Sequence, residues 1–182
     1  MDAGSESLAG LTMEAANAEF EDVFRLHYAR IVRVIVRIVH DPGRAEELAA
    51  DVFWKYLHGS RAHDESPAGW LYRTAVRKGL DELRRQRRQE KYRPLFSFLG
   101  IAAAPSPEQL HAATRDQQQV RAVLATFKRR DSELLILRSE GLSYQEIAGV
   151  LRINETSMGT LLRRAQEAFR KEYVNRYGPQ SF

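Results

Sequence analysis

The sequence predicts an all-α chain of two small helical domains joined by a linker. Apolar residues recur at spacings of three and four along most of the chain, which is the period of an amphipathic helix. Helix-capping residues precede several of these stretches, and no strand-like alternation of useful length occurs. With 182 residues and 43% hydrophobic content, the chain is long enough and apolar enough to bury a core in each domain.

The first domain is expected over residues 19–93, after a flexible N-terminal segment, 1–18. Asp41-Pro42-Gly43 should end its first helix, because proline disfavours helix in the residue before it. Ser66 and Pro67 predict the start of its third helix as an N-cap and a first-turn proline, and Pro94 should end that helix. The helices expected here are 19–40, 44–57 and 67–92, with a polar loop over 58–65.

The second domain is expected over residues 107–176, after a linker, 94–106, and before a tail, 177–182. The linker contains several apolar side chains, Phe96 and Phe98 among them, which favour docking on another surface. The expected helices run from Ser106-Pro107 to Phe127, from Asp131 or Ser132 to Glu140, from the cap Ser143 over 144–151, and from Asn154 or Thr156 to about Tyr173.

The segment from Ser143 to Phe169 predicts a helix-turn-helix. Ile147 and Ala148 point inward, Ile153 fills the turn, and the next helix returns apolar residues to the core at Met158, Leu161, Leu162 and Ala165. This geometry places a second helix in the DNA major groove. A helical hairpin that binds no DNA is the alternative, and the basic residues Arg152, Arg163, Arg164, Arg170 and Lys171 count against it.

A strongly basic helix is expected from Trp70 to Arg93. It holds nine basic residues against three acidic ones, whereas the whole chain has a net charge of only +4. Such a stripe suits a nucleic-acid backbone, and Trp70 and Tyr72 are aromatic groups that could stack on exposed bases. A solvated charged face, with Trp70 in the core, is the alternative interpretation.

Several classes of protein are disfavoured by composition. The absence of cysteine excludes disulfides, thiolate metal sites and thiol nucleophiles. No signal peptide is recognisable, and arginines interrupt the longest apolar stretches, so we expect a cytoplasmic protein without membrane insertion. There is no glycine-rich phosphate loop, metal-ligand cluster or paired catalytic set, so we expect no enzyme, no catalytic residue, no metal and no cofactor.

Taken in order, these segments resemble bacterial sigma factors of the extracytoplasmic function (ECF) type, in the sigma-seventy family. The motifs AEELAADVF, WLYRTA and EGLSYQEIAGVL carry the resemblance, which covers residues 19–173. It implies that the two domains are sigma region 2 and sigma region 4. It also implies a subunit that binds RNA polymerase core and directs promoter recognition, DNA melting and transcription initiation. Members of this type are often held by an anti-sigma factor.

The resemblance also implies roles for particular residues. The second helix would hold the clamp coiled coil of the largest polymerase subunit, through Glu46, Glu47, Asp51 and Phe53. The third helix and the loop before it would bind the minus-ten promoter DNA, through His63, Trp70, Tyr72, Arg73, Arg77, Lys78, Arg84 and Arg85. Region 4 would rest on the polymerase flap and bind the minus-thirty-five DNA, through Ser143, Tyr144, Arg152, Thr156, Ser157, Gly159, Thr160, Arg163 and Arg164.

Two features depart from the family pattern. Many members have Lys, Ser and Arg where this chain has Gly159, Thr160 and Leu161, and many have Asn where it has Arg77. The recognition helix is therefore lightly charged, and helix capping would explain Thr156 and Ser157 as well as base contact does. We expect the second domain alone to bind DNA weakly.

Two other functions remain as alternatives. A helix-turn-helix regulator that never joins the polymerase would explain the second domain equally well, but not residues 20–93. A helical adaptor that binds only protein would leave the basic third helix unexplained.

Overall fold

The computed structural model describes residues 3–59, 66–98 and 115–179, with side chains described over 17–59, 66–90 and 115–179. All regular elements in these ranges are helical, which confirms the predicted all-α class. They are α1 (Ala3–Val39), α2 (Pro42–His58), α3 (Pro67–Phe98), α4 (Arg115–Thr126), α5 (Arg129–Ser139), α6 (Tyr144–Leu151), a 3-10 turn η3 (Glu155–Ser157) and α7 (Met158–Tyr177).

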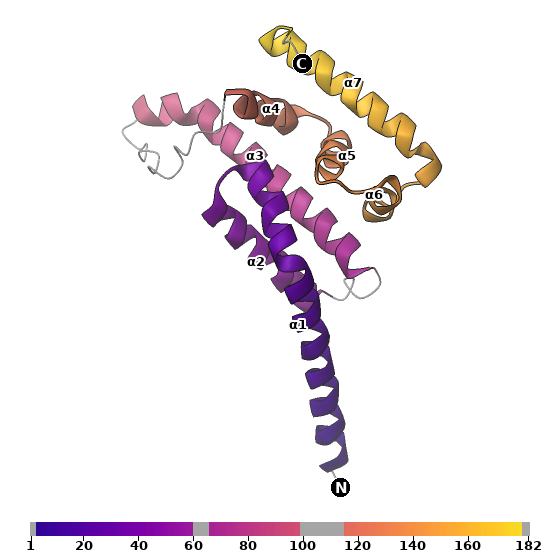
Figure 1. Cartoon of the computed structure of the whole chain (residues 1–182). Coiled ribbons are helices and arrows are strands. Elements are labelled where there is room, and N and C mark those ends of the chain that lie inside the picture. The colour runs from indigo at the N-terminus through magenta and orange to yellow at the C-terminus, as the bar shows by residue number, and fades with distance from the viewer. Residues whose placement is uncertain (1–2, 60–65, 99–114, 180–182) are drawn as a thin grey trace.

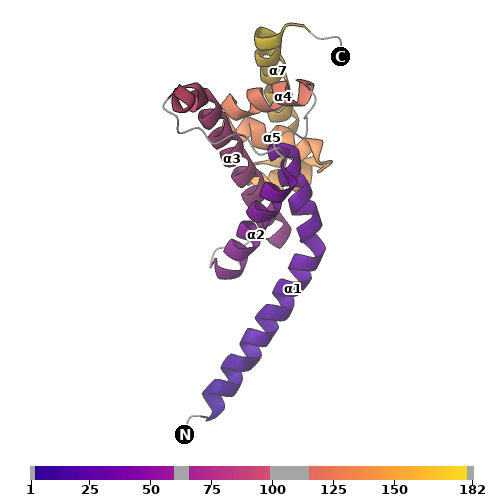
Figure 2. The same ribbon diagram turned by 90° about the vertical axis from the view of Figure 1, so that its left-hand side faces the viewer.

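The helices form two groups that meet along α3. Helices α1, α2 and α3 pack on one another, and the N-terminal part of α1 projects away from the rest of the molecule (Figures 1 and 2). Helices α4 to α7 gather at the opposite end, with α7 on the outside (Figure 1). Helix α3 contacts α4, α5 and α6 as well as α1 and α2, so both groups pack against it.

The core of the first group joins apolar faces of its three helices. Ile35 on α1, Val52 on α2 and Leu80 on α3 are fully buried. Helices α1 and α3 approach closely at Gly79, where an added Cβ would lie 2.8 Å from Ile38 Cδ1. Glycine is required there because the space for a side chain is already filled.

The core of the second group is smaller. It is built around Leu134 and Leu137 on α5, Ile147 on α6 and Met158 on α7, all fully buried. The far end of α7 is held by a buried hydrogen bond, in which the Tyr173 hydroxyl donates to Gln119 Oε1 on α4 at 2.6 Å.

The junction between α1 and α2 differs from the prediction. The first helix begins at Ala3 rather than at residue 19, but it ends at Val39, before Asp41-Pro42-Gly43, as predicted. The second helix begins at Pro42 rather than at Arg44, so these three residues are not a connecting turn. Instead Asp41 caps α2, its carboxylate accepting a hydrogen bond from the Arg44 N–H at 2.9 Å, and Pro42 occupies the first turn. Proline is tolerated there because a first-turn N–H has no partner within the helix. The chain reverses at His40, whose φ is 57°.

Two further helix boundaries were predicted wrongly. Helix α3 continues through Pro94 to Phe98, where the donor that proline removes is lost only near the helix end. Helix α5 begins at Arg129 rather than at an Asp131 or Ser132 cap. The Ser132 hydroxyl is buried and donates to the carbonyls of Leu124 and Lys128.

The expected start of the second domain at Ser106-Pro107, the linker beyond Phe98 and most of the loop after His58 lie outside the described residues. The domain boundaries stay predictions. The predicted α6, by contrast, is confirmed residue for residue, and Asn154 does cap the turn that leads into α7.

Candidate nucleic-acid interface

Helix α6 begins with a complete capping box. Ser143 Oγ accepts from the Glu146 N–H at 3.2 Å, and the Glu146 carboxylate accepts from the Ser143 N–H at 2.7 Å. The hydrogen bond that the Ser143 backbone N–H donates to the Glu146 carboxylate, and after it the Ser143 side chain, hold the pKa of Glu146 below its ordinary value. The helix ends at Arg152, which adopts a left-handed conformation with φ of 55°. Local interactions therefore fix both ends of the first helix of the motif.

Helix α7 presents one face to the core and one to solvent. Met158, Leu162 and Ala165 are buried, as predicted. The Asn154 carboxamide oxygen accepts from the N–H and the hydroxyl of Thr156, so Thr156 takes part in capping. The exposed residues at the start of the motif's second helix are Thr156, Ser157, Gly159, Thr160, Arg163 and Arg164. This face has the position that a helix-turn-helix needs for the major groove.

The aromatic ring of Tyr144 lies beside this face. It is 42% exposed, and an added Cβ at Gly159 would lie 3.9 Å from its Cε2 atom. The Arg138 guanidinium lies 5.5 Å from the centre of the same ring. Gly159 thus leaves the Tyr144 ring uncovered, which was not apparent from the sequence.

The two aromatic residues at the start of α3 are half-buried. Trp70 packs against Tyr56, with ring centres 5.7 Å apart. Tyr72 lines a cavity of about 720 Å³ between the two helix groups, together with His27, Arg30 and Arg152. Tyr72 is thus the more accessible of the two to a ligand entering that cavity.

The basic residues of α3 make contacts inside the chain. Lys78 pairs with Asp51 on α2 at 2.5 Å, and Arg85 pairs with Glu82 on α3 itself at 2.6 Å. Arg73, Arg77 and Arg84 instead reach across to the C-terminal helices. His63 lies outside the described residues. The predicted cations are therefore assembled on one helix, but most of them already have partners.

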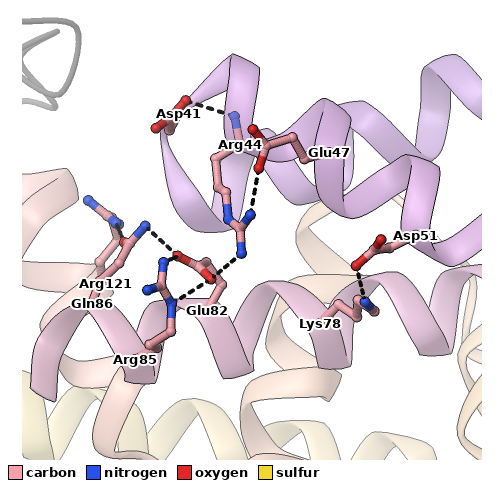
Figure 3. Close-up of polar contacts among 9 residues, drawn as sticks. All are labelled: Asp41, Arg44, Glu47, Asp51, Lys78, Glu82, Arg85, Gln86 and Arg121. Atoms are coloured by element: carbon pink, nitrogen blue, oxygen red, sulfur yellow. Dashed lines mark hydrogen bonds and ion pairs between the residues drawn. The ribbon is translucent and has the colours of Figure 1, made fainter. Parts of the chain in front are cut away.

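A buried acid ties α2 to α3. Glu82 is only 5% exposed and accepts hydrogen bonds from Arg44 on α2 at 3.0 Å and from Arg85 at 2.6 Å (Figure 3). Burial opposes ionisation of Glu82, but the hydrogen bonds from the two arginines outweigh it and hold its pKa below the ordinary value. Arg44 also binds Glu47 at 2.5 Å. Its guanidinium therefore contacts both the buried Glu82 and an exposed carboxylate of α2.

The outer face of α2 is acidic. Glu46, Glu47 and Asp51 are exposed, and Lys78 holds the pKa of Asp51 below its usual range. Phe53 is 2% exposed and packs edge-on against Phe24 on α1, with ring centres 4.9 Å apart. Phe53 therefore belongs to the core, and any role it has in binding is to hold α2 in place.

Trp54 was missed by the sequence analysis. It is 66% exposed and lies over His58, with ring centres 4.0 Å apart. An exposed tryptophan is uncommon on a surface without a partner. The helical period contained the signal, since it placed Phe53 and Tyr56 inward and so turned Trp54 outward.

Two features are absent from the described residues. No helix there is long and apolar enough to cross a membrane. No cluster of three or more His, Asp or Glu side chains there is arranged to hold a metal ion.

The helix-turn-helix and the basic helix beside it define the class as a helical DNA-binding protein. Comparison with known proteins identifies the family within this class. The family model described as Sigma-70 region 2 matches residues 23–89, and the one described as Sigma-70, region 4 matches residues 117–168.

Curated relatives agree with this assignment. The RNA polymerase sigma factor YlaC of Bacillus subtilis is 31% identical over 83% of this chain and 90% of its own length. The ECF RNA polymerase sigma factor SigE of Mycolicibacterium smegmatis is 23% identical over 92% of this chain and 66% of its own. The solved structure of the sigma factor RpoE from Bartonella quintana, in complex with the anti-sigma factor NepR, is 18% identical, with a TM-score of 0.48 over 85% of this chain and 96% of its own. The chain belongs to the sigma-70 family of RNA polymerase sigma factors, in its ECF group.

Proposed function

We propose that this chain binds RNA polymerase core and directs it to promoters, where it takes part in DNA melting and transcription initiation in the cytoplasm. The observation that carries the proposal is the order of two units in one chain. A helical unit with an acidic helix and a basic helix comes first, and a helix-turn-helix with an exposed recognition face follows. A regulator that only binds DNA would need the second unit alone, so that alternative is not favoured.

The polymerase-binding surface is proposed to be the outer face of α2. Glu46, Glu47 and Asp51 form an acidic row there, and Trp54 adds a large apolar side chain beside it. An acidic surface suits a basic partner helix, and an exposed tryptophan is the type of residue that contributes most at interfaces. Phe53 supports this face from the core.

The two DNA contacts are proposed to have different characters. Helix α3 and the loop before it would hold the opened minus-ten strand by stacking and phosphate contacts. The residues proposed for this contact are His63, Trp70, Tyr72, Arg73, Arg77, Lys78, Arg84 and Arg85. The helix-turn-helix would contact duplex DNA at the minus-thirty-five element. The residues proposed for this contact are Ser143, Tyr144, Arg152, Thr156, Ser157, Gly159, Thr160, Arg163 and Arg164. Arg163 is paired with Glu167 at 2.6 Å, so the recognition face carries little net positive charge and should bind weakly alone.

The test is reconstitution. The purified chain is added to bacterial core polymerase, and promoter-specific initiation is measured on a genomic fragment library. We expect transcripts with defined start sites that depend on the chain. Binding of DNA without binding of core polymerase, and no initiation, would support the regulator instead.

A charge-reversal variant tests the polymerase surface. Asp51→Arg places a cation where the proposed basic partner would sit and next to Lys78, so core affinity should fall about tenfold or more while the melting temperature changes little. Asp22→Arg is the matched control, because Asp22 lies on α1 with its side chain 82% exposed. Equal core affinity for the two variants would contradict the assignment of α2.

A further inference from the structure

The cavity beside Tyr72 is lined mostly by residues that have no role in the proposed polymerase and DNA contacts. It lies between α1, the start of α3, the connection from α5 to α6, and α6, which packs on α3 (Figure 1). Its volume is about 720 Å³. Sites for small molecules have volumes of roughly 300–1,000 Å³, so the cavity is large enough for a small organic ligand.

Two arginines of this cavity form no hydrogen bond or ion pair with the described part of the chain. Arg30 and Arg33 line the cavity from α1 and are exposed. Arg37, one turn further along α1, is by contrast paired with Glu140 at 3.1 Å. Residues three apart on a helix have Cβ atoms about 5–6 Å apart, so both guanidinium groups can reach one phosphate group. Helix α1 thus presents two available cations to the cavity.

The two carboxylates of the cavity have partners. The Glu140 side chain is 8% exposed and pairs with Arg37, and Glu146 accepts the Ser143 N–H in the capping box at 2.7 Å. The backbone and then the side chain of Ser143 lower the pKa of Glu146, and the charge of Arg30 adds to this effect. With Arg152 as well, three arginines line the cavity against two glutamates, one of which Arg37 already neutralises. The cavity therefore has an excess of positive charge.

Helix α3 adds a positive helix end to the same cavity. Ala68 and Gly69, in its first turn, both line the cavity. Among the described residues, the earliest backbone hydrogen bond of α3 is the one that the Trp70 N–H donates to the Ser66 carbonyl at 3.0 Å. The N–H groups of a first helical turn have no acceptor within the helix and carry the positive end of its dipole, so they favour an anion.

Two rings lie beside these cations. Tyr72 is half-buried and lines the cavity, and an aromatic ring of this kind is a stacking surface for a nucleobase. His27 also lines it, and the His27 Nδ1 atom is buried without a hydrogen-bond partner in the described part of the chain. Burial, and after it the charge of Arg30, lower the pKa of His27, so its neutral ring can donate or accept a hydrogen bond. A ligand with a phosphate group and a planar polar ring matches both parts of the cavity.

We propose that this cavity binds a free nucleotide, with the phosphate held by Arg30, Arg33 and the first turn of α3, and the base beside Tyr72 and His27. Guanidinium groups and the N–H groups of a helix N-terminus both bind phosphate well. Tyr72 also belongs to the surface proposed for the minus-ten strand, but Arg30, Arg33 and His27 do not. The inference therefore goes beyond the proposed function, and its test needs neither polymerase nor a promoter.

Calorimetric titration of the full chain with the 5′-monophosphates of the four ribonucleosides tests the site. We expect at least one to bind with a dissociation constant below about 1 mM, and about tenfold more tightly than inorganic phosphate or its own nucleoside. Arg30→Gln with Arg33→Gln should weaken that binding about tenfold or more. Arg25→Gln with Arg88→Gln is the matched control, because it removes the same charge from exposed positions outside the cavity lining and should bind as the unaltered chain does.

Filling the cavity is an independent test. Gly149 lines the cavity, and apart from its chain neighbours and the backbone of its own helix no described atom lies within 4 Å of an added Cβ. Gly149→Leu adds a bulky apolar side chain there, in a helix that favours leucine over glycine. We expect nucleotide binding to be lost while the melting temperature is unchanged or higher. In the unaltered chain, the NMR signals of the His27 ring should shift when the nucleotide is added, while those of the exposed His58 on α2 should not.

Three outcomes would overturn the proposal. The first is that none of the four monophosphates binds, or that the two double variants bind with equal affinity. The second is equal affinity for inorganic phosphate and for the nucleotides, because the rings would then contribute nothing. The third is that a single-stranded oligonucleotide of mixed sequence binds through Arg30 and Arg33 whereas the mononucleotides do not, because the cavity would then belong to a DNA strand.

Discussion

Gly79→Ala is expected to destabilise the protein although alanine favours helix. Relative to glycine, alanine in a helix interior gains about 1 kcal/mol. The new Cβ would lie 2.8 Å from Ile38 Cδ1 and 3.3 Å from Ile38 Cβ, and the second atom cannot rotate away. Overpacking of this kind costs about 1–3 kcal/mol, which leaves a net loss of up to about 2 kcal/mol. The melting temperature should fall by up to roughly 8 °C.

Gly149→Ala is the matched control. It also adds a methyl group to a helix, but apart from its chain neighbours and the backbone of its own helix no described atom lies within 4 Å of the new Cβ, so this variant should be stabilised by about 0.5–1 kcal/mol. Adding Ile38→Val to Gly79→Ala removes the Cδ1 atom at the closest contact and should recover part of the loss, a coupling visible in a double-mutant cycle of urea unfolding. Equal stabilisation by the two alanine variants would refute the close approach of α1 and α3.

Other outcomes follow from single side chains. Trp54→Ala should change the free energy of unfolding by less than about 0.5 kcal/mol. It should weaken binding to RNA polymerase core about tenfold, measured by fluorescence anisotropy, and unchanged affinity would exclude Trp54 from the interface. Glu82→Gln leaves Arg44 and Arg85 without their shared carboxylate, and because both arginines reach water the loss should be about 2 kcal/mol by urea unfolding. Because the pKa of Glu82 is lowered, its contribution is present above about pH 4.5 and is lost as the pH falls through its folded-state pKa, so the variant should show a shallower acid dependence. Burial lowers the pKa of His40 below 6.5, so the folded state resists its protonation and stability should decline as the pH falls below that value; His40→Asn, which tolerates a left-handed backbone, should reduce this slope, and an unaltered slope would exclude His40.

The elements that the sequence predicts best are those with local signals. Ser143 and Glu146 are three residues apart, and the capping box they form needs no knowledge of the rest of the chain. The apolar spacing that placed Met158, Leu162 and Ala165 in the core is equally local. Helix α6 was therefore predicted to the residue, while the start of α5 was not, because Lys128 provides no side-chain cap.

The partners of charged residues could not be predicted in the same way. Arg73 is read from the sequence as a cation available to DNA, but its acceptor is a carbonyl 77 residues away. Nothing in local composition distinguishes it from Arg88, which is exposed. Phe53 illustrates the same limit, since its burial depends on the aromatic residues that α1 brings beside it. Residue type predicted which side chains are cationic or apolar. Tertiary packing determined which of them are buried or already hydrogen-bonded within the chain.

The lightly charged outer face of α7 has a consequence for the time that the protein spends on DNA. A duplex-reading face with few cations gains little from neutralising phosphates, so an encounter made through this face alone would end quickly. The polymerase that the chain is proposed to bind would then determine how long the recognition helix stays on a promoter.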